Sequence, residues 1–509
     1  MRPTLRSTLP SRRGLLGGGL LGAAAMAVGG PARARPWADP PHHADLLLPE
    51  GVRAERVLEL FLYGGLGPFE SFYVVEENGR PDDPAYPNEQ WHLFGAAQAA
   101  AWEGCGVGAD LLPFATDALG QSVKLGPLVE PLRQRPDLLD RMRILVMRHD
   151  LEPHEAAIPY ALTGLRLGNA RLASLGASVQ RYFQDRDETG RRLPYSYVLY
   201  PGTEIPTDNL RASVAVGLHP GSARPLNLRI DDSEALAALM ARATVGEARA
   251  AIDALHAHYL GQQRARYTTA TGLRLPARGL DEHGIASEAM AEAQALGEVF
   301  RSANLKAERL SSCVMEPAAS TIGLGIGLAT HLLRHPQTPA RHVTVFDGGL
   351  VTASGGGGYD VHTHHLRDTS RNLLHTLSQL TARINLPGEG DPAKIDLDDT
   401  MIVLNTEFGR TPYVQPYSRN GTNHHPYGYV TVLIGGPIRA EQRGVVGAIG
   451  PDAWADRCLT PAESRAAVLA AMGIYPFTQE SFTIGDLRGL ADEGDALAWL
   501  NEIVLGVKP

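Results

Sequence analysis

Short runs of apolar and β-branched residues recur along the chain and predict buried strands. The clearest run, Val57–Tyr63, stops at the glycine pair Gly64-Gly65. Other runs, rich in Val, Ile and Tyr, have the length and content of strands that are covered on both faces. They lie at Ile144–Met147, Tyr197–Tyr200, His342–Phe346, Met401–Leu404 and Tyr429–Ile434.

Helical patterns separate these runs. One set of apolar residues recurs at spacings that place it on a single helical face: Leu366, Leu373, Leu377, Leu380 and Ile384. An Ala-rich stretch of about 232–310 predicts a helical insertion, with one helix from about 234 towards 260, interrupted near Gly246, and another over 286–305. Strands that alternate with helices favour an α/β fold with a doubly wound, mainly parallel sheet. Clusters of Pro, Gly and polar residues predict loops at 201–225 and 386–394.

The first 34 residues have the pattern of an export signal. The pair Arg12-Arg13 precedes an uncharged run of Gly, Ala and Leu, and Ala32-Arg33-Ala34 offers a small-x-small cleavage site. This arrangement is typical of the twin-arginine route, so we expect a periplasmic or secreted protein without a stable membrane span after cleavage. An uncleaved anchor is the alternative, but the run is short of the ~20 apolar residues that a span needs.

Composition narrows the class of protein. The 509 residues are 44% apolar and 20% charged, which suits a large folded core. Loss of the first 34 residues, with five Arg and no acid, leaves 42 basic and 56 acidic side chains and moves the net charge from −9 to −14. An acidic surface disfavours nucleic acid and anionic membrane as partners. We expect Cys105, Cys313 and Cys458 to be structural, because their spacing matches no metal-finger pattern.

One familiar catalytic motif is incomplete in this sequence and another is absent. His154-Glu155 begins a zincin-like sequence, but Ile158 stands where the second His must be. No Gly-x-Ser-x-Gly elbow occurs, which disfavours a serine hydrolase of the α/β type.

Three polar groups adjoin the predicted strands of the C-terminal half: Asp360–His365, Thr406–Arg410 and Asn420–His425. Loops at the carboxyl ends of neighbouring parallel strands share one crevice, so these groups can converge. Asp, Glu and neutral imidazole together suit Zn²⁺ or Mn²⁺. Arg410 is placed to orient an anionic substrate or to pair with Glu407. The alternative is that the histidines belong to a solvated loop and a turn.

Five blocks of the sequence resemble, in order, a large secreted bacterial family, domain of unknown function 1501. Leu62–Phe72 resembles its Gly-Gly-Pro-Ser-x-x-Asp-Thr-Phe-Asp stretch, and Arg148–Gly164 its His…Leu-Thr-Gly block. Asp360–His362 resembles its Asp-Thr-His. Thr406–Arg410 matches its Ser/Thr-Glu-Phe-Gly-Arg, the most specific of these signatures, and Asn420–Gly436 resembles its Asn…Gly-x-Asp-His…Gly-Gly block.

The resemblance implies an alkaline phosphatase-like fold for a single domain of residues 35–509. That superfamily includes phosphatases, sulfatases and cofactor-independent phosphoglycerate mutases, which hold metals with carboxylates and imidazoles at strand ends. If the ligand positions of that superfamily are carried over to this chain, the ligands would be Asp360 with His362 or His364, then Glu407, His424 and, less directly, Glu70. The catalytic residues would be Arg410 on the transferred group, Ser71 near the nucleophile loop and His154 beside the metal or the substrate.

The chain departs from the family pattern at several of these positions. Gly67 replaces the family's Ser, Glu70 and Tyr73 replace its two N-terminal Asp, and Asn423 replaces the Asp of Asp-His. Phe408 cannot serve as a His ligand. These changes weaken a two-metal site and leave the nucleophile unassigned.

Two functions follow from the sequence. The first is a metal-dependent hydrolase of phosphate or sulfate esters, with Zn²⁺ or Mn²⁺ and a small anionic or glycan-linked substrate. The second is a non-catalytic exported protein that retains the fold to bind a glycan, an anion or a partner protein. The number of ions and the oligomeric state stay open.

Overall fold

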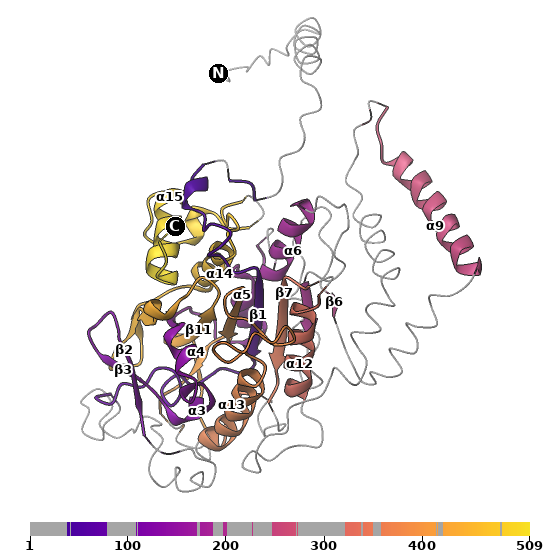
Figure 1. Ribbon diagram of the computed structural model, residues 1–509. Helices are drawn as coiled ribbons and strands as arrows, with labels where there is room; N and C mark the ends of the chain where they lie inside the picture. Colours follow the sequence, from indigo (N-terminus) through magenta and orange to yellow (C-terminus); the bar gives the residue numbers. More distant parts are fainter. Residues whose placement is uncertain are drawn as a thin grey trace, which may run out of the picture.

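A mainly parallel sheet forms the centre of the molecule (Figure 1). The computed structural model describes residues 38–40, 42–78, 108, 110–169, 174–186, 197–200, 226–227, 247–270, 272, 321–336, 339–349, 358–413, 415, 421–478 and 481–508. The strands of the sheet are, in spatial order, β12 (Gly444–Val446), β4 (Met142–Met147), β11 (Tyr429–Gly435), β8 (Thr400–Asn405), β1 (Arg56–Leu62), β7 (His342–Asp347), β5 (Tyr197–Tyr200) and β6 (Leu226–Asn227).

One strand of this sheet runs against the others. β11 pairs antiparallel with β4 on one side and with β8 on the other, whereas every other pairing in the sheet is parallel. The mixed α/β class and the six predicted strands are confirmed. The direction of β11 was not expected, because an apolar run carries no signal of the direction in which its strand pairs.

The two faces of the sheet are covered by separate apolar clusters. Alternate residues of β1 point to opposite faces, so Leu58 and Leu60 join the cluster that contains α13 while Val57 joins the other. The first face is covered by α3 (Glu130–Arg133), α4 (Pro136–Asp140), α12 (Thr321–Leu333) and α13 (His365–Thr381). The second is covered by α6 (Leu175–Arg186), α14 (Pro461–Ala471), α15 (Glu493–Trp499) and η7 (Leu500–Leu505).

The predicted helix of the C-terminal half is α13. Leu373, Leu377 and Leu380 are buried against the sheet, as the spacing requires, and Leu366 packs at the border of the same cluster. Ile384 lies beyond the helix end but still enters the cluster. Residues 386–394 form a loop, as predicted.

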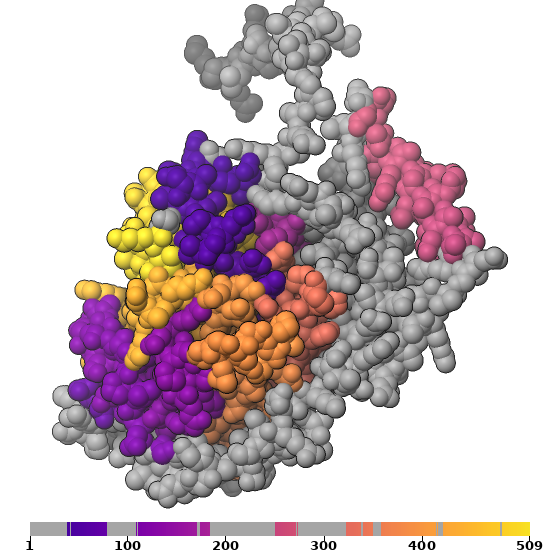
Figure 2. Space-filling model, in the orientation of Figure 1, coloured from indigo at the N-terminus to yellow at the C-terminus, as the bar shows by residue number. Residues whose placement is uncertain are grey.

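Smaller elements complete the described chain. They are η1 (Ala44–Leu46), η3 (Pro127–Val129), α5 (His154–Thr163), η5 (Ala440–Gln442), η6 (Ile484–Asp486) and the two-stranded ribbons β2 (Leu112–Thr116) with β3 (Ser122–Leu125), β9 (Gly409–Arg410) with β10 (His424–His425), and β13 (Ala448–Ile449) with β14 (Ala455–Arg457). The N-terminal η1 packs beside the C-terminal elements, seen as indigo beside yellow in Figure 2, and Asn501 donates a hydrogen bond to the Leu46 carbonyl at 2.7 Å.

Part of the predicted insertion is described. α9 (Glu247–Arg266) begins directly after Gly246 and is largely exposed. The expected export signal, the loop at 201–225, the helix at 286–305, Cys105 and Cys313 lie outside the described residues. Cys458 is a free thiol. Among the described helices, none is both long and apolar enough to cross a membrane.

Candidate functional site

The topology brings the predicted polar groups to one edge of the sheet. β1 and β8 are parallel, so Gly64 and Glu407, which follow them, lie together. Because β11 runs the other way, its first residues reach the same edge, and β10 with His424 directly precedes it. β4 also ends there, and α5 begins shortly afterwards at His154. The edge thus matches the position at which open α/β sheets bind ligands.

A close backbone approach fixes Asp360 over the end of β1. A Cβ atom at Gly64 would lie 2.0 Å from the backbone nitrogen of Asp360, and Gly64 has a φ of +109° that other residues rarely adopt. The adjacent Tyr63 carbonyl accepts a hydrogen bond from the Tyr359 N–H at 2.6 Å. Only glycine therefore allows the two loops to meet at this point.

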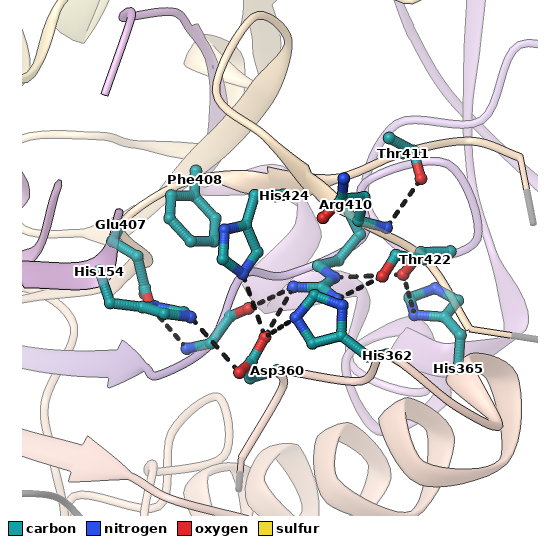
Figure 3. Close-up of polar contacts among 12 residues, drawn as sticks. His154, Asp360, His362, His365, Glu407, Phe408, Arg410, Thr411, Thr422 and His424 are labelled. Carbon is teal, nitrogen blue, oxygen red and sulfur yellow. Dashed lines mark hydrogen bonds and ion pairs between the residues drawn. The ribbon is translucent and has the colours of Figure 1, made fainter. Parts of the chain in front are cut away.

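Asp360 is the centre of the cluster (Figure 3). Its Oδ1 lies 2.9 Å from His362 Nε2, 3.0 Å from Arg410 Nη1 and 3.3 Å from His424 Nε2. Its Oδ2 lies 3.4 Å from His154 Nε2. Three imidazoles and one guanidinium thus surround a carboxylate that is only 5% exposed.

His154 is held from behind by a second carboxylate. Its Nδ1 lies 2.8 Å from Glu407 Oε1, which also accepts the Gly64 N–H at 2.7 Å. An ionised carboxylate only accepts hydrogen bonds, so Nδ1 of His154 is the donor and Nε2 faces Asp360. This arrangement, carboxylate to Nδ1 and open Nε2, is how proteins orient histidines that ligate metals.

His424 is oriented in the same way by a backbone group. Its Nδ1 lies 3.0 Å from the Glu152 carbonyl oxygen, which can only accept. Its ring stacks on Phe408 with centroids 4.5 Å apart, so the predicted non-ligand Phe408 instead holds a neighbouring imidazole in place. As in His154, the Nε2 of His424 is directed at Asp360.

The arrangement fits a divalent metal ion. One ligand atom each from His154, Asp360 and His424 can be chosen so that all lie within 4.8 Å of one another. Nε2 of His154 is buried and has no well-formed hydrogen bond, since Asp360 Oδ2 lies 3.4 Å away. Two imidazoles whose Nδ1 hydrogens are already committed would both have to be doubly protonated to donate to Asp360. A metal ion would satisfy the same nitrogens without those extra charges, and three protein ligands with an open position are typical of catalytic zinc sites.

The electrostatics of the cluster couple metal binding to protons. Burial lowers the pKa of His154, but hydrogen bonds and charges from Asp360 and Glu407 outweigh burial and raise that pKa to about 9. Burial by itself would raise the pKa of Asp360, but the three imidazoles and Arg410 hold it well below its ordinary value. Without an ion, His154 is therefore protonated and Asp360 ionised at neutral pH, so an ion must displace a proton from His154.

Arg410 pairs with Asp360, which the sequence did not indicate. The guanidinium is completely buried. Its Nη1 donates to Asp360 and to the Gly64 carbonyl, and its Nε and Nη2 donate to the hydroxyl and carbonyl of Thr422. Burial lowers the pKa of Arg410 to about 10. Its donors are thus used within the protein, and Arg410 stabilises the negative charge of Asp360 from the interior.

Comparison with known families decides the membership of the chain. The model of the family described as "Protein of unknown function (DUF1501)" matches residues 54–500, most of the sequence. The chain belongs to the DUF1501 family. No curated protein and no solved structure matches it. The cluster around Asp360 lies inside the matched region, and its chemistry rests on the geometry described above.

In this DUF1501 chain, Glu70 lies apart from the cluster. Its carboxylate contacts Nε2 of His365, and both side chains are buried. Nδ1 of His365 lies 3.2 Å from the hydroxyl of Thr422, which in turn accepts from Arg410. Glu70 is thereby connected to Asp360 through a chain of hydrogen bonds rather than by sharing a ligand position.

Ser71 does not join the cluster either. Its hydroxyl is buried and donates to the Gly67 carbonyl at 2.6 Å. Tyr73 is buried and donates to Asp117. Among the described residues, no hydroxyl or thiol hydrogen-bonds to Asp360 or to the imidazoles of His154, His362 and His424.

The structure distinguishes between the histidines of the Asp360 loop. Asp360 is bonded to His362, whereas His364 is the residue before α13, has the left-handed conformation with φ 54°, and makes none of the cluster's contacts. Glu407, proposed from the sequence as a ligand, is fully buried behind His154. His154, which was predicted only as a neighbour, is the residue that joins Asp360 and His424 in the group that could hold a metal ion. Its place at the start of a helix after a strand was the available signal.

Proposed function

We propose that this protein is a metal-dependent hydrolase of phosphate or sulfate esters, acting after export to the periplasm or beyond. The observation that carries the proposal is the convergence of His154, Asp360 and His424, with both imidazoles held through Nδ1 by acceptors. Zn²⁺ or Mn²⁺ suits this set of nitrogen and oxygen donors.

The architecture supports an alkaline phosphatase-like assignment. The sheet is mixed but mainly parallel, helices flank both faces, and the candidate ligands gather where strands end. These features agree with the resemblance of the sequence to that superfamily. Proteins that share a fold can differ in function, so the functional proposal depends on the residues of the site.

The charges of the cluster favour an anionic substrate. The guanidinium of Arg410 lies behind Asp360, and His362 and His424 face the same carboxylate. A bound divalent ion would add Lewis acidity and would acidify water. Phosphate and sulfate esters present oxygens that such an ion can bind and whose negative charge it can neutralise.

His362 is the proposed general base. It is the most exposed imidazole of the cluster, with 32% of its side chain accessible, and its Nε2 lies 2.9 Å from Asp360. With its Nε2 hydrogen on Asp360, its Nδ1 can accept a proton from water. The water oxygen then bonds to phosphorus or sulfur, the bond from that atom to the ester oxygen breaks, and the proton held by His362 passes to the departing alkoxide, which leaves as the alcohol. Use of water agrees with the lack of a hydroxyl or thiol bonded to the cluster among the described residues.

Purified full chain loaded with Zn²⁺ or Mn²⁺ is tested on nitrophenyl phosphate and nitrophenyl sulfate. We expect turnover that is lost in Asp360→Ala together with the metal. His362→Ala should keep the metal but lose about 10²–10⁴-fold in rate, the usual contribution of a general base. His258→Ala, an exposed imidazole on α9, and Asp398→Ala, an exposed carboxylate, are the matched controls and should change neither property. Absence of turnover on both esters with the metal in place would refute the hydrolase.

A non-catalytic binding protein is the second candidate. The observation in its favour is that Ser71, the hydroxyl nearest the expected nucleophile position, is committed to the Gly67 carbonyl. Metal binding without turnover on either ester would favour this candidate. Activity that disappears in folded Asp360→Ala would exclude it.

A further inference from the structure

A stacked aromatic pair lies beside the candidate metal centre. The rings of Tyr427 and Trp454 have centroids 4.5 Å apart and are inclined by only 5°. Trp454 nevertheless keeps 43% of its surface exposed. Arg148 lies over the Trp454 ring at 4.9 Å from the centroid. Part of the Trp454 side chain is therefore left to solvent, although Tyr427 and Arg148 both pack against its ring.

The pair lies at the same edge of the sheet as the cluster around Asp360. Arg148 directly follows β4, and Tyr427 lies two residues before β11 in the segment that also carries His424. Glu152 connects the two regions, because its carbonyl accepts from His424 Nδ1 and its carboxylate accepts from the Tyr427 hydroxyl at 3.1 Å. Glu152 is exposed and His424 is partly exposed, so solvent reaches the residues that connect the cluster to the pair.

The loop that carries Trp454 is fixed by its backbone. Ala453 is buried and has a φ of +64°, a conformation that residues other than glycine rarely adopt. Its carbonyl accepts from His425 Nε2 at 2.8 Å. A Cβ atom at Gly428 would lie 2.3 Å from that carbonyl oxygen, so the loop is packed directly on the segment before β11. The aromatic surface is held rigid, which lowers the entropy lost when a ligand binds.

We propose that Tyr427, Trp454, Arg148 and Glu152 form a subsite for the neutral sugar rings of a glycan whose esterified end reaches the metal centre. This inference names the substrate class and in that respect rests on the proposed hydrolase. The negative face of an aromatic ring attracts the C–H groups on the flat face of a pyranose. Glu152 accepts hydrogen bonds from sugar hydroxyls, and Arg148 donates to their oxygens.

The charges of Arg148 and Glu152 favour an uncharged sugar ring beside the aromatic pair. Arg148 already lies over Trp454, so a cationic ligand would meet a like charge there. The Glu152 carboxylate opposes an anionic group beside Tyr427. A hydroxyl-rich ring without charge fits both neighbours, and the anionic ester is attracted instead to the imidazoles around Asp360.

The test is binding of neutral β-linked hexasaccharides of glucose, N-acetylglucosamine, galactose and xylose to the full chain, followed by calorimetry and tryptophan fluorescence. We expect at least one of them to bind at millimolar concentration or below. Trp454→Ala should weaken its binding about tenfold or more, while Trp454→Phe, which keeps an aromatic ring, should retain most of it. Tyr259→Ala, which removes an exposed aromatic of α9, is the matched control and should bind as wild type.

The same titration in Asp360→Ala separates the two proposals. Sugar binding that persists there supports the subsite whether or not the protein hydrolyses nitrophenyl esters. Absence of binding by all four hexasaccharides, or equal binding by wild type and folded Trp454→Ala, would overturn the subsite and leave the hydrolase standing. If Trp454→Ala does not fold, Glu152→Ala on the exposed surface takes its place, with weaker binding expected and unchanged binding overturning the inference.

Discussion

His154 lies between two carboxylates, with its Nδ1 2.8 Å from Glu407 and its Nε2 3.4 Å from Asp360. Glu407 is fully buried and Asp360 faces the other imidazoles. The first carboxylate therefore orients the ring, and the second shares the position that an ion would occupy.

Glu407→Gln tests the orienting role. The amide is nearly the same shape as the carboxylate but lacks the charge that holds the Nδ1 hydrogen of His154. We expect metal affinity to fall about 10–100-fold, the usual effect of changing the group behind a ligand. Competition with a chromogenic chelator measures the affinity. Glu463→Gln changes another buried carboxylate, whose hydrogen bonds go to Thr460 and Arg488, and should leave the affinity unchanged; equal affinities for all three proteins would contradict the orienting role.

Metal affinity should depend on pH with a defined sign. The pKa of His154 is about 9 in the metal-free protein, so at lower pH the ion must displace a proton. Affinity should therefore rise about tenfold per pH unit from about pH 7 to 9 and then level off. Calorimetry in buffers of different ionisation enthalpy should count one proton released near pH 7, and a count of zero would contradict the protonated His154.

The same proton affects the stability of the metal-free fold. The pKa of His154 is raised above its ordinary 6.5, so its contribution to stability is complete below pH 6.5 and is lost as the pH rises through about 9. The difference in unfolding free energy between wild type and His154→Gln should accordingly shrink over this interval. Urea unfolding at several pH values measures it, and a difference that grows with pH would have the wrong sign.

Thr422→Val interrupts the chain of hydrogen bonds behind Asp360. The substitution keeps the side-chain shape but removes the oxygen that accepts from Arg410 Nε and contacts His365 Nδ1. A buried donor left without a partner costs about 1–3 kcal/mol, and urea unfolding should show a loss in this range. Thr330→Val is the matched control, since that hydroxyl only donates within its own helix to Ile326. Equal losses for the two variants would argue against the chain.

Gly421→Ala tests how closely the ribbon that carries His424 packs on the Asp360 loop. A Cβ atom there would lie 1.8 Å from the His362 carbonyl oxygen, so one of the two segments must move. We expect lower thermal stability together with weaker metal binding. Gly261→Ala in α9, where nothing lies within 4 Å, should instead raise stability by up to about 1 kcal/mol. Normal metal binding by Gly421→Ala would show that this contact does not position the ligands.

The sequence was sufficient to predict the strands and several members of the site. Buried strands such as β1 and β7 are continuous apolar runs, and such runs are recognisable without a partner strand. Asp360, His362 and His424 could be proposed because polar clusters beside strands of one sheet converge. The direction of β11 and the proximity of β4 could not be deduced, because both are properties of pairing rather than of a segment.

Strand pairing and loop packing determine the partner of each polar side chain at the site. The position of β4 brings His154 to Asp360. His154 is therefore a candidate ligand although the zincin-like motif to which it belongs is incomplete. The close packing at Gly64 directs Arg410 to Asp360 instead of Glu407. Glu70 was expected near a metal because of its place in the motif, but the start of α13 supplies His365 as its partner. Such tertiary contacts leave no periodic signal in the sequence.

The most direct test of the account is the metal content of the full chain, purified without chelator and measured by plasma mass spectrometry. The wild type should hold about one Zn or Mn per chain. His154→Ala and Asp360→Ala should lose it, while His364→Ala and His258→Ala should retain it. Folded wild type that binds no Zn²⁺ or Mn²⁺ even when incubated with an excess, or His154→Ala that binds as wild type, would contradict the metal centre proposed here.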